Sequence, residues 1–368
     1  MTYNDAPSGI YSSQVIDVVN YLNKEFDAGV KLISFISVRN FFLLRRKIKS
    51  ELPTAIVLPM FPGVHNWMAN RYLLQLLILL FKPKAIIGRS VIATHLAFKV
   101  KNSSVKNIVY DGRGAISAEW HEYKVITRPD MLQNIFELEK EAVIKADYRI
   151  SVSSELIKYW QEVFNYKSNV HVVIPCTLNG MFERVSISEE SVKDARLALN
   201  LDFSDLVFIY SGSTAGWQSF DLISQFIRKI IEDYPKSKMV FLSDIDENIL
   251  QLQKTFQGKI ICKKVNPNEV PNYLIAADYG LLTRTTSTTN QVASPVKFAE
   301  YLSCGLPVII SPKLGDYSDF VSDKKCGYLM DDFNIESIDK QFIKSVALNY
   351  FTKKSHKNSY ESLIQFLK

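Results

Sequence analysis

The sequence predicts an α/β protein made of two domains with parallel sheets. Helical segments and short apolar strands alternate from one end of its 368 residues to the other, which is the pattern of strands joined by helical crossovers. The alternation restarts after Pro175, so the second half repeats the organisation of the first. A chain of this length is long enough for two domains that each bury a core.

In the first half, apolar runs rich in β-branched residues predict six strands, and amphipathic spacing predicts the helices between them. The strands are expected at residues 30–37, 55–58, 85–88, 107–110, 148–152 and 170–174, and the chief helices at 12–26, 67–81 and 131–145. Only residues 2–4 precede the first loop, at Ser8 and Gly9, so the first strand looks clipped. Either the true start lies upstream or this strand is unusually short.

The second half repeats the pattern, with strands expected at 206–210, 238–242, 259–262, 279–283 and 307–310 and a terminal helix at about 350–368. Two successive doubly wound units with a junction near residues 175–185 match two facing Rossmann-like domains.

Composition limits the class of protein. Apolar residues make up 47% and charged residues 22% of the chain, which predicts a globular protein. The formal charge of +6 is compatible with anionic donors or anionic lipid, and no basic tract with interleaved aromatic residues indicates nucleic-acid binding. The four cysteines and five histidines lack the spacing of a disulfide framework or a zinc site. We therefore expect a reduced, cytoplasmic protein without a secretory signal.

Residues 294–311 combine a helix start, an anion site and a buried strand. Ser294 can cap the helix, Pro295 fits its first turn, and the free N–H groups of that turn, at and after Val296, face an anion. Lys297 and Glu300 are three residues apart and can project together. Gly305 then stops the helix, and the short apolar run 306–310 suits a buried strand.

A second phosphate site is expected in the loop that follows the strand at 206–210. Gly212 and Gly216 flank Ser213 and allow backbone N–H groups to approach an anion closely. A helix follows, and its dipole favours negative charge. Taken alone, this pattern is equally typical of a tight connection.

The first domain supplies charged residues among glycines at the end of the strand at 107–110. Asp111, Arg113 and Glu119 would point into an interdomain cleft if that strand end faces it. The alternative is a local Asp111–Arg113 ion pair that stabilises a turn. Arg89, at the end of the strand at 85–88, is a weaker version of the same arrangement.

The segment P-V-K-F-A-E-Y-L-S-C-G-L-P-V, residues 295–308, resembles the signature of glycosyltransferase family 4, which comprises retaining enzymes of the GT-B fold. The D-G-R-G-x4-E segment at residues 111–119 resembles members that act in bacterial surface-polysaccharide assembly, of lipopolysaccharide or capsule. The resemblance implies an acceptor domain at 1–178, a nucleotide-sugar domain at 179–349, and a terminal helix at about 350–368 that packs back on the first. It also implies that Glu300 accepts hydrogen bonds from the nucleotide ribose.

Two departures from the family pattern bear on the site. Many members carry Arg and Lys after the loop glycines, where this chain has Trp217 and Gln218, so Arg284 and Lys297 are expected to neutralise the diphosphate instead. Val292 replaces the first glutamate of the family's E-x7-E pair. Contact with the donor sugar is therefore expected from backbone N–H groups or from neighbours such as Asn290, which lies in a loop rich in hydroxyls. The alternative is that this loop is an ordinary surface loop.

The resemblance implies a retaining hexosyltransferase that moves a sugar from a UDP- or GDP-linked donor to a saccharide or lipid-linked saccharide, without a metal cofactor. Asp111, Arg113, Arg284 and Lys297 are the expected catalytic residues. Ser8, Gly9, Arg89 and Glu119 are expected on the acceptor side. The Asp244–Asp246 D-x-D pattern of metal-dependent transferases lacks any accompanying feature. The alternatives are a GT-B sugar-nucleotide 2-epimerase and a non-catalytic nucleotide-sugar-binding assembly subunit.

Two segments bear on membrane contact. The apolar run at 72–81 is shorter than the roughly 20 residues that span a bilayer, so we expect a buried core helix there. The segment 41–49 sets an apolar cluster beside a basic one, which fits either an interfacial helix on the inner face of the plasma membrane or a solvated helix with one buried face.

Overall fold

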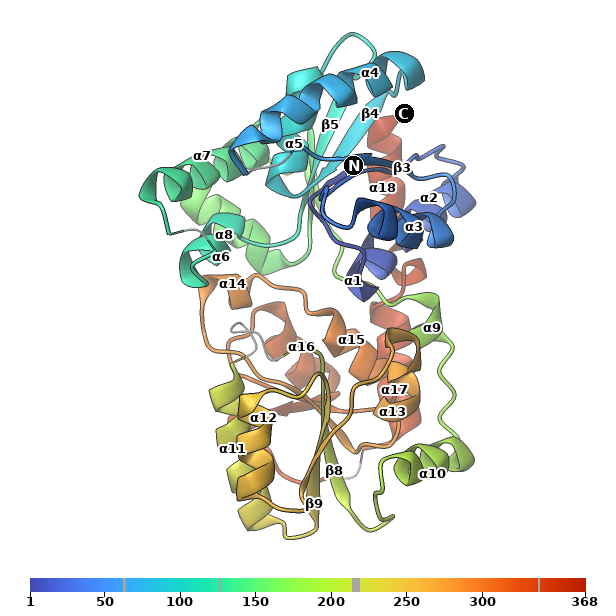
Figure 1. The fold of residues 1–368 in the computed structure, drawn as a ribbon, viewed down its shortest axis with the longest axis vertical. Coiled ribbons are helices and arrows are strands. Elements are labelled where there is room, and N and C mark those ends of the chain that lie inside the picture. The colour runs from blue at the N-terminus through green and yellow to red at the C-terminus, as the bar shows by residue number, and fades with distance from the viewer. Residues whose placement is uncertain (62–63, 126, 214–218, 337) are drawn as a thin grey trace. The chain divides into compact units, whose positions relative to one another are not determined.

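The computed structural model describes residues 1–61, 64–125, 127–213, 219–336 and 338–368 (Figure 1). The chain forms two compact units. Unit 1 comprises Met1–Thr177, Val292–Ser294 and His356–Lys368, and unit 2 comprises Leu178–Gln291 and Pro295–Ser355. Each unit is an α/β layer structure in which every strand pair of the described sheets is parallel.

Unit 1 contains two sheets that meet edge to edge, at β1 and β4. The first has the order β1-β2-β3 and the second β4-β5-β6-β7. The backbone joins them, because Arg89 N–H donates to the Met1 carbonyl over 2.9 Å and the Met1 amine donates to the Ile87 carbonyl over 2.7 Å. Strands β2 and β3 therefore lie on one side of β1, and β4 lies on the other side of β1. The strand order reverses between β1 and β4, so this junction is the topological switch point. The strands are β1 (Thr2–Tyr3), β2 (Ile33–Ile36), β3 (Ile56–Pro59), β4 (Ala85–Arg89), β5 (Asn107–Gly112), β6 (Tyr148–Ser151) and β7 (His171–Val173).

Helices cover both faces of unit 1. Figure 1 shows α2, α3 and α18 on one side and α5, α7 and α8 on the other. Tyr360, Leu363 and Ile364 of α18 are buried against β5 and β6, so the last helix completes the core of this unit. The helices are α1 (Gly9–Tyr11), η1 (Ser12–Ile16), α2 (Asp17–Phe26), α3 (Phe41–Glu51), η2 (Val64–Asn70), α4 (Arg71–Phe81), α5 (Ser90–Val100), α6 (Ile116–Glu122), α7 (Pro129–Lys145), α8 (Ser154–Phe164) and α18 (Lys357–Leu367).

Unit 2 has one six-stranded sheet with the order β10-β9-β8-β11-β12-β13, and its switch point lies between β8 and β11. Figure 1 shows α11 and α12 on one side of it and α13 and α17 on the other. The strands are β8 (Leu206–Ser211), β9 (Ser237–Leu242), β10 (Ile260–Cys262), β11 (Tyr279–Leu282), β12 (Val308–Ile310) and β13 (Gly327–Leu329). The helices are α9 (Gly180–Glu183), α10 (Glu189–Ala198), α11 (Phe220–Asp233), α12 (Glu247–Thr255), η4 (Pro267–Glu269), α13 (Val270–Leu274), α14 (Thr288–Gln291), α15 (Val296–Ser303), α16 (Asp316–Lys324), η5 (Met330–Asp332), α17 (Lys340–Tyr350) and η6 (Lys354–His356).

The predicted α/β class with parallel sheets is confirmed. The eleven strands expected from apolar runs all form, the first of them shortened to Ile33–Ile36. Two differences concern the end of the chain. Strand β13 was not predicted. The terminal helix expected at about 350–368 forms as α18, but it begins only at Lys357, after α17 has ended at Tyr350.

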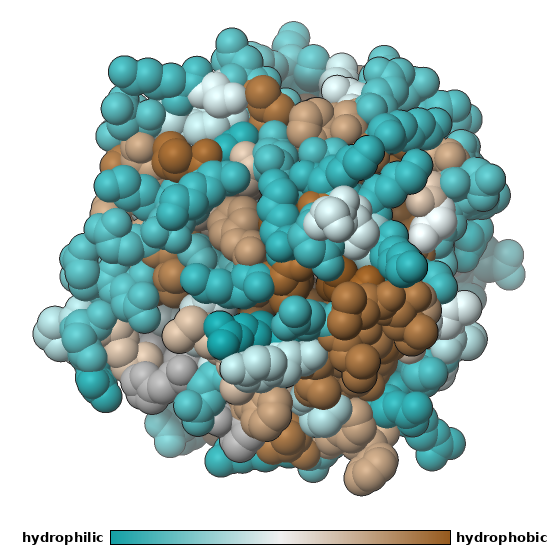
Figure 2. Space-filling model, turned by 90° about the horizontal axis from the view of Figure 1, so that it is seen from above, coloured by the Kyte–Doolittle hydropathy of each residue, from teal (hydrophilic) through white to brown (hydrophobic). Residues whose placement is uncertain are grey.

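Residues 72–81 form the predicted helix, as part of α4, but only one face of that helix is buried. In α4, Leu74 and Ile78 are buried, whereas Leu76 and Leu80 are 63% and 69% exposed. Tyr72 and Leu79 are exposed as well, so an apolar row faces outward. Figure 2 shows hydrophobic side chains gathered in a patch on the face toward which α4 lies in Figure 1. None of the described helices has the length and apolar character needed to cross a membrane.

Candidate functional site

The carboxyl end of β8 and the start of α15 meet at the switch point of unit 2. Gly212 follows β8 with φ of 122°, a left-handed conformation that favours glycine. A Cβ atom added there would lie 2.5 Å from Lys297 Nζ, so the ammonium occupies the space above the glycine. Lys297 Nζ also donates to Tyr210 Oη over 3.2 Å and lies 4.4 Å from the centre of the Tyr210 ring. The structure thus brings together the glycine loop and the lysine that the sequence singled out.

Tyr301 fixes α15 against this edge of the sheet. Its hydroxyl accepts a hydrogen bond from Ser211 N–H over 2.8 Å. Its ring lies over Gly280 in β11, where an added Cβ atom would be 2.6 Å from it. Sequence reasoning missed the contact between Tyr301 and Gly280. A glycine inside a strand, which marks a close approach of another group, was the available signal.

Arg284 follows β11 and is held by the loop that comes after it. Its backbone N–H donates to Ser311 Oγ over 2.8 Å, and its Nη1 donates to Asn290 Oδ1 over 3.4 Å. Asn290 is buried, and its amide nitrogen donates to the Thr285 carbonyl over 3.0 Å. The Asn290 amide thus links the loop, through its nitrogen, to Arg284, through its oxygen, and positions Arg284.

Lys297 and Glu300 form a half-buried pair of titrating groups. The pKa of Lys297 is lowered to about 7, chiefly by burial and then by the nearby Arg284, while Glu300 opposes the shift. The pKa of Glu300 is raised to about 7 because the effect of burial exceeds the opposing effect of Lys297. Both groups thus change charge near neutral pH, and an anion close to Lys297 would favour its protonated form.

The predicted cap at Ser294 is wrong. Helix α15 begins at Val296, Pro295 occupies the capping position, and no side chain caps this end. Ser294 Oγ instead accepts a hydrogen bond from Cys176 N–H over 2.8 Å within unit 1. Gly305 has φ of 73° just past the end of α15, in agreement with the predicted stop.

The remaining loop residues are described in part. Ser213 is exposed, and its carbonyl accepts a hydrogen bond from Tyr210 Oη over 2.5 Å. Gly216, Trp217 and Gln218 lie outside the described residues.

In unit 1, Asp111 bridges two arginines. Its carboxylate oxygens lie 3.3 Å from Arg89 Nη1 and 3.4 Å from Arg113 Nη1. Arg89 Nε also pairs with Asp5 over 3.0 Å, and Arg113 Nη2 donates to Cys176 Sγ over 3.1 Å. The Asp111–Arg113 ion pair that the sequence left as an alternative is present, as part of a network across the ends of β4 and β5.

Two of the four expected acceptor-side residues share a cavity of about 560 Å³ in unit 1, Arg89 and Glu119. This cavity lies at the carboxyl ends of β1 to β4 and is closed by α5, α6 and α7. Ser8 and Gly9 are exposed and do not line it. The Ser8 hydroxyl accepts from Tyr11 N–H over 3.2 Å and caps α1, and Gly9 faces open space.

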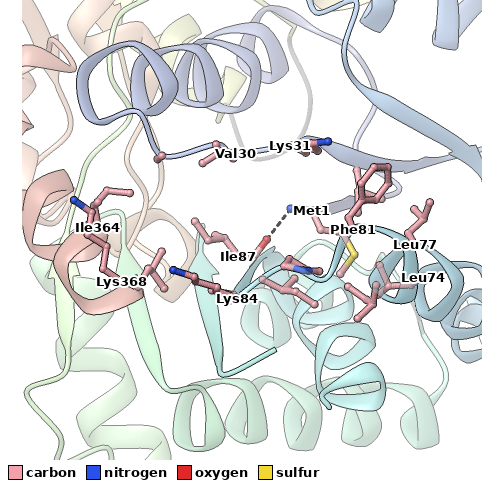
Figure 3. Close-up of a pocket in the computed structure, with 18 of the residues that line it drawn as sticks. Met1, Val30, Lys31, Leu74, Leu77, Phe81, Lys84, Ile87, Ile364 and Lys368 are labelled. Atoms are coloured by element: carbon pink, nitrogen blue, oxygen red, sulfur yellow. Dashed lines mark hydrogen bonds between the residues drawn. The ribbon is translucent and has the colours of Figure 1, made fainter. Parts of the chain in front are cut away.

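A second cavity, of about 480 Å³, lies at the amino edge of the same junction in unit 1 (Figure 3). Figure 3 shows Lys31, Lys84 and Lys368 around it, with Leu74 and Leu77 of α4 on one wall. Strand β1 has only two residues, so no strand fills the space between the segment before β2 and the start of β4. The cavity occupies that space.

The D-x-D pattern has a structural role. Asp246 caps α12 by accepting from Ile249 N–H over 2.9 Å, and Asp244 pairs with Lys264. Across the described residues no cluster of three or more metal-ligating side chains occurs.

Comparisons with known proteins identify the fold. Residues 226–365 match the family model for the C-terminal domain of glucosyltransferase 3-like proteins. A comparison with the curated proteins returns no significant match.

Among solved structures, sucrose-phosphate synthase from Thermosynechococcus elongatus aligns with a TM-score of 0.71 at 12% identity and covers 100% of this chain and 98% of that one. A glycosyltransferase from Rickettsia africae aligns at 0.65 and 13% identity, with 98% of each chain covered. HepE from Anabaena, in complex with UDP, aligns at 0.64 and 12% identity, over 100% of this chain and 91% of that one. These likenesses establish the GT-B glycosyltransferase fold.

Proposed function

We propose that this chain is a retaining hexosyltransferase that transfers a sugar from a UDP- or GDP-linked donor, held by unit 2, to a saccharide or lipid-linked acceptor held by unit 1. The observation that carries the proposal is the convergence of Gly212, Lys297 and Arg284 at the switch point of unit 2. A diphosphate at this edge would find backbone N–H groups and two cationic side chains. The HepE structure contains UDP, which supports a nucleotide at this kind of fold.

The proposed chemistry is mainly electrostatic. As the bond from the sugar to the diphosphate breaks, negative charge grows on the leaving oxygens, and Lys297 and Arg284 stabilise it more in the transition state than in the ground state. Glu300 accepts hydrogen bonds from the ribose hydroxyls. The leaving phosphate takes the proton of the acceptor hydroxyl as that hydroxyl attacks the same face of the sugar. In this scheme the two cations perform the charge neutralisation, so no metal cofactor is included.

The proposed acceptor half is the network around Asp111. Arg113 and Arg89 hold the Asp111 carboxylate from two sides, which fixes its position at the end of β5. Asp111→Asn and Arg113→Ala are expected to abolish transfer and to leave UDP affinity unchanged. A large loss of thermal stability in both variants would indicate a purely structural network instead.

The biological setting belongs to the proposal as well. We place this transfer in bacterial surface-polysaccharide synthesis, of lipopolysaccharide or capsule, in the cytoplasm or peripherally on the inner face of the plasma membrane. The match of residues 226–365 to a glucosyltransferase-like domain supports the transferase class.

The decisive experiment incubates the purified protein with UDP- and GDP-sugars, with and without candidate acceptors, and follows nucleotide release with EDTA present and absent. Acceptor-dependent release that survives EDTA, and that falls in Lys297→Met, supports the proposal. Conversion of the donor sugar without any acceptor would indicate an epimerase. Binding of UDP without release in any mixture would indicate a non-catalytic binding subunit.

A further inference from the structure

The cavity of about 560 Å³ in unit 1 lies where doubly wound folds bind ligands, outside the carboxyl ends of the strands at the switch point. Tyr3 and Asn4 leave β1 on one side of the junction, and Arg89 and Ser90 leave β4 on the other. Ser90 has φ of 69°, a strained conformation for a residue with a side chain. The volume falls in the range typical of small-molecule sites, about 300 to 1,000 Å³.

The walls of this cavity are mainly apolar. Trp67 and Trp120 line it together with Val91, Ile92, Ile116 and Ile135. Polar side chains from the strand ends and from α6 also line the cavity, namely Tyr3, Asn4, Ser37, Ser90 and Glu119. These polar groups suit the polar end of a ligand, but they do not cover the apolar walls. The walls instead suit a hydrocarbon group, whose burial is favourable in proportion to its area.

Exposed apolar side chains occur in the lining of the cavity and also along η2 and α4. Val38 and Val125 line the cavity and are 47% and 55% exposed, and Met68 is exposed next to Trp67. From Met68 the exposed residues Tyr72, Leu76, Leu79 and Leu80 follow at spacings of three and four, along one face of α4. This row contributes to the apolar surface that a long hydrocarbon chain would need outside the cavity (Figure 2).

Arg39 supplies a charge beside these apolar walls. It is exposed, it lines the cavity, and no carboxylate among the described residues pairs with it. Arg89 differs, because Asp5 and Asp111 already neutralise it. Arg39 can therefore accept an anionic group that adjoins the hydrocarbon, as a guanidinium does for a phosphate.

We propose that this cavity takes the end of a lipid-linked acceptor at which a hydrocarbon chain joins its phosphate. The hydrocarbon lies between Trp67 and Trp120, and the phosphate lies against Arg39. The inference rests on the proposed function, since it names the class of acceptor for that transferase.

Farnesyl phosphate, below its aggregation concentration, is the probe for a calorimetric titration of the full chain, with farnesol, inorganic phosphate and a free disaccharide as comparison ligands. We expect farnesyl phosphate to bind more tightly than any of the other three. Arg39→Gln should weaken it by about tenfold or more, the loss that follows from removing a charge-assisted hydrogen bond. Val38→Asp should do the same without a folding defect, because Val38 is exposed. Arg45→Gln, on α3 and outside the cavity lining, is the matched control and should bind as the unaltered protein does.

Equal affinity for farnesol and farnesyl phosphate would overturn the phosphate contact, and equal affinity for the disaccharide would overturn the lipid-linked class. Unchanged binding in both Arg39→Gln and Val38→Asp would overturn the location. UDP titration of the same samples separates the two proposals. If the unaltered protein binds UDP but not farnesyl phosphate, only this inference is overturned. If the unaltered protein does not bind UDP, the proposed transferase is overturned.

Discussion

We expect the charge of Lys297 to depend on whether an anion is bound. Its pKa is lowered to about 7 by burial, so at pH 8 it is largely neutral in the unliganded protein. A diphosphate favours the ammonium and raises this pKa, and the protein then takes up a proton on binding. We expect calorimetric titration with UDP at pH 8, in buffers of different ionisation enthalpy, to show this uptake, and Lys297→Met to lose it. Lys254→Met, at an exposed position of α12, should retain it. Equal proton uptake in both variants would contradict the placement of Lys297 at the diphosphate.

Glu300 makes a different contribution, because it accepts hydrogen bonds in its ionised form. Glu300→Gln keeps the shape and removes the charge, and should weaken UDP binding at pH 8 by about 1.5 to 3 kcal/mol, the range for hydrogen bonds to a charged group. Glu232→Gln on α11, an exposed position, serves as the control in the same titration. An unaltered dissociation constant for Glu300→Gln would remove the ribose contact from the proposal.

Two glycines with positive φ allow the conformation of the loop after β8 to be tested by substitution, one in that loop and one as a control. Gly212 has φ of 122° and Gly258 has φ of 71°, so alanine is strained at both. Only at Gly212 would the new methyl meet a functional side chain, since Lys297 Nζ lies 2.5 Å from that position whereas Gly258 faces open space.

Gly212→Ala should therefore displace Lys297 and lower UDP affinity by about tenfold or more. Gly258→Ala should cost about 1 to 2 kcal/mol of stability and leave UDP affinity unchanged. Thermal unfolding and UDP titration of both variants check these outcomes. Similar UDP affinities in the two variants would show that the close approach to Lys297 has no functional role.

The exposed face of α4 predicts contact with a membrane surface. Its exposed apolar side chains are typical of an interfacial helix, and α3 separately carries the exposed Phe42 beside basic residues. The protein should co-sediment with anionic vesicles at low salt and dissociate as salt rises, since the attraction is screened beyond roughly 8 to 10 Å. The double variant Leu76→Gln and Leu80→Gln should lose most of this binding, and Leu250→Gln in unit 2 should not. Equal recovery of all three proteins would refute the prediction.

The elements also show how far the sequence could be read. Long apolar runs predicted the strands because burial on both faces of a parallel sheet leaves that pattern. Strand β13 has only three residues, too few for a pattern. The exposure of α4 could not be read from its composition, because a helix that is apolar all round looks the same whether its outer face meets core or solvent.

At the site, spacing and position after strands predicted that Gly212, Lys297 and Glu300 would gather in one place. The cap at Ser294 failed because Cys176 N–H, 118 positions away in the chain, competes for the same hydroxyl. The contact between Tyr301 and Gly280 was missed although a glycine inside a strand was a local signal, because that signal does not say which residue packs on the glycine. The identity of a partner distant in the sequence is not encoded locally.

The two units are interleaved along the chain, which passes from one to the other near residues 177, 291, 294 and 355. Tyr360, Leu363 and Ile364 of α18 bury themselves in unit 1, and each such side chain contributes about 1.5 to 3 kcal/mol. A chain that ends at residue 355 should therefore lose a large part of the roughly 5 to 15 kcal/mol that holds a domain folded.

Thermal unfolding of that shortened chain should show unit 1 melting at a lower temperature, while unit 2 retains UDP binding. The same chain with Lys357–Leu367 added back as a separate peptide is the control, and partial recovery of the unit 1 transition is expected. An unchanged melting profile after removal of α18 would mean that the helix is dispensable.

The same interleaving bears on how the protein is made. A ribosome releases residues from first to last, and domains usually fold in that order. Here the hydrophobic surface formed by Leu22, Val109 and Tyr148 stays uncovered until α18 has been synthesised. Unit 2, whose residues run from 178 to 355 with a break of three, has its whole core available earlier. We therefore expect the unit encoded second to complete its folding first, and the unit encoded first to depend on protection from aggregation until translation reaches the last helix.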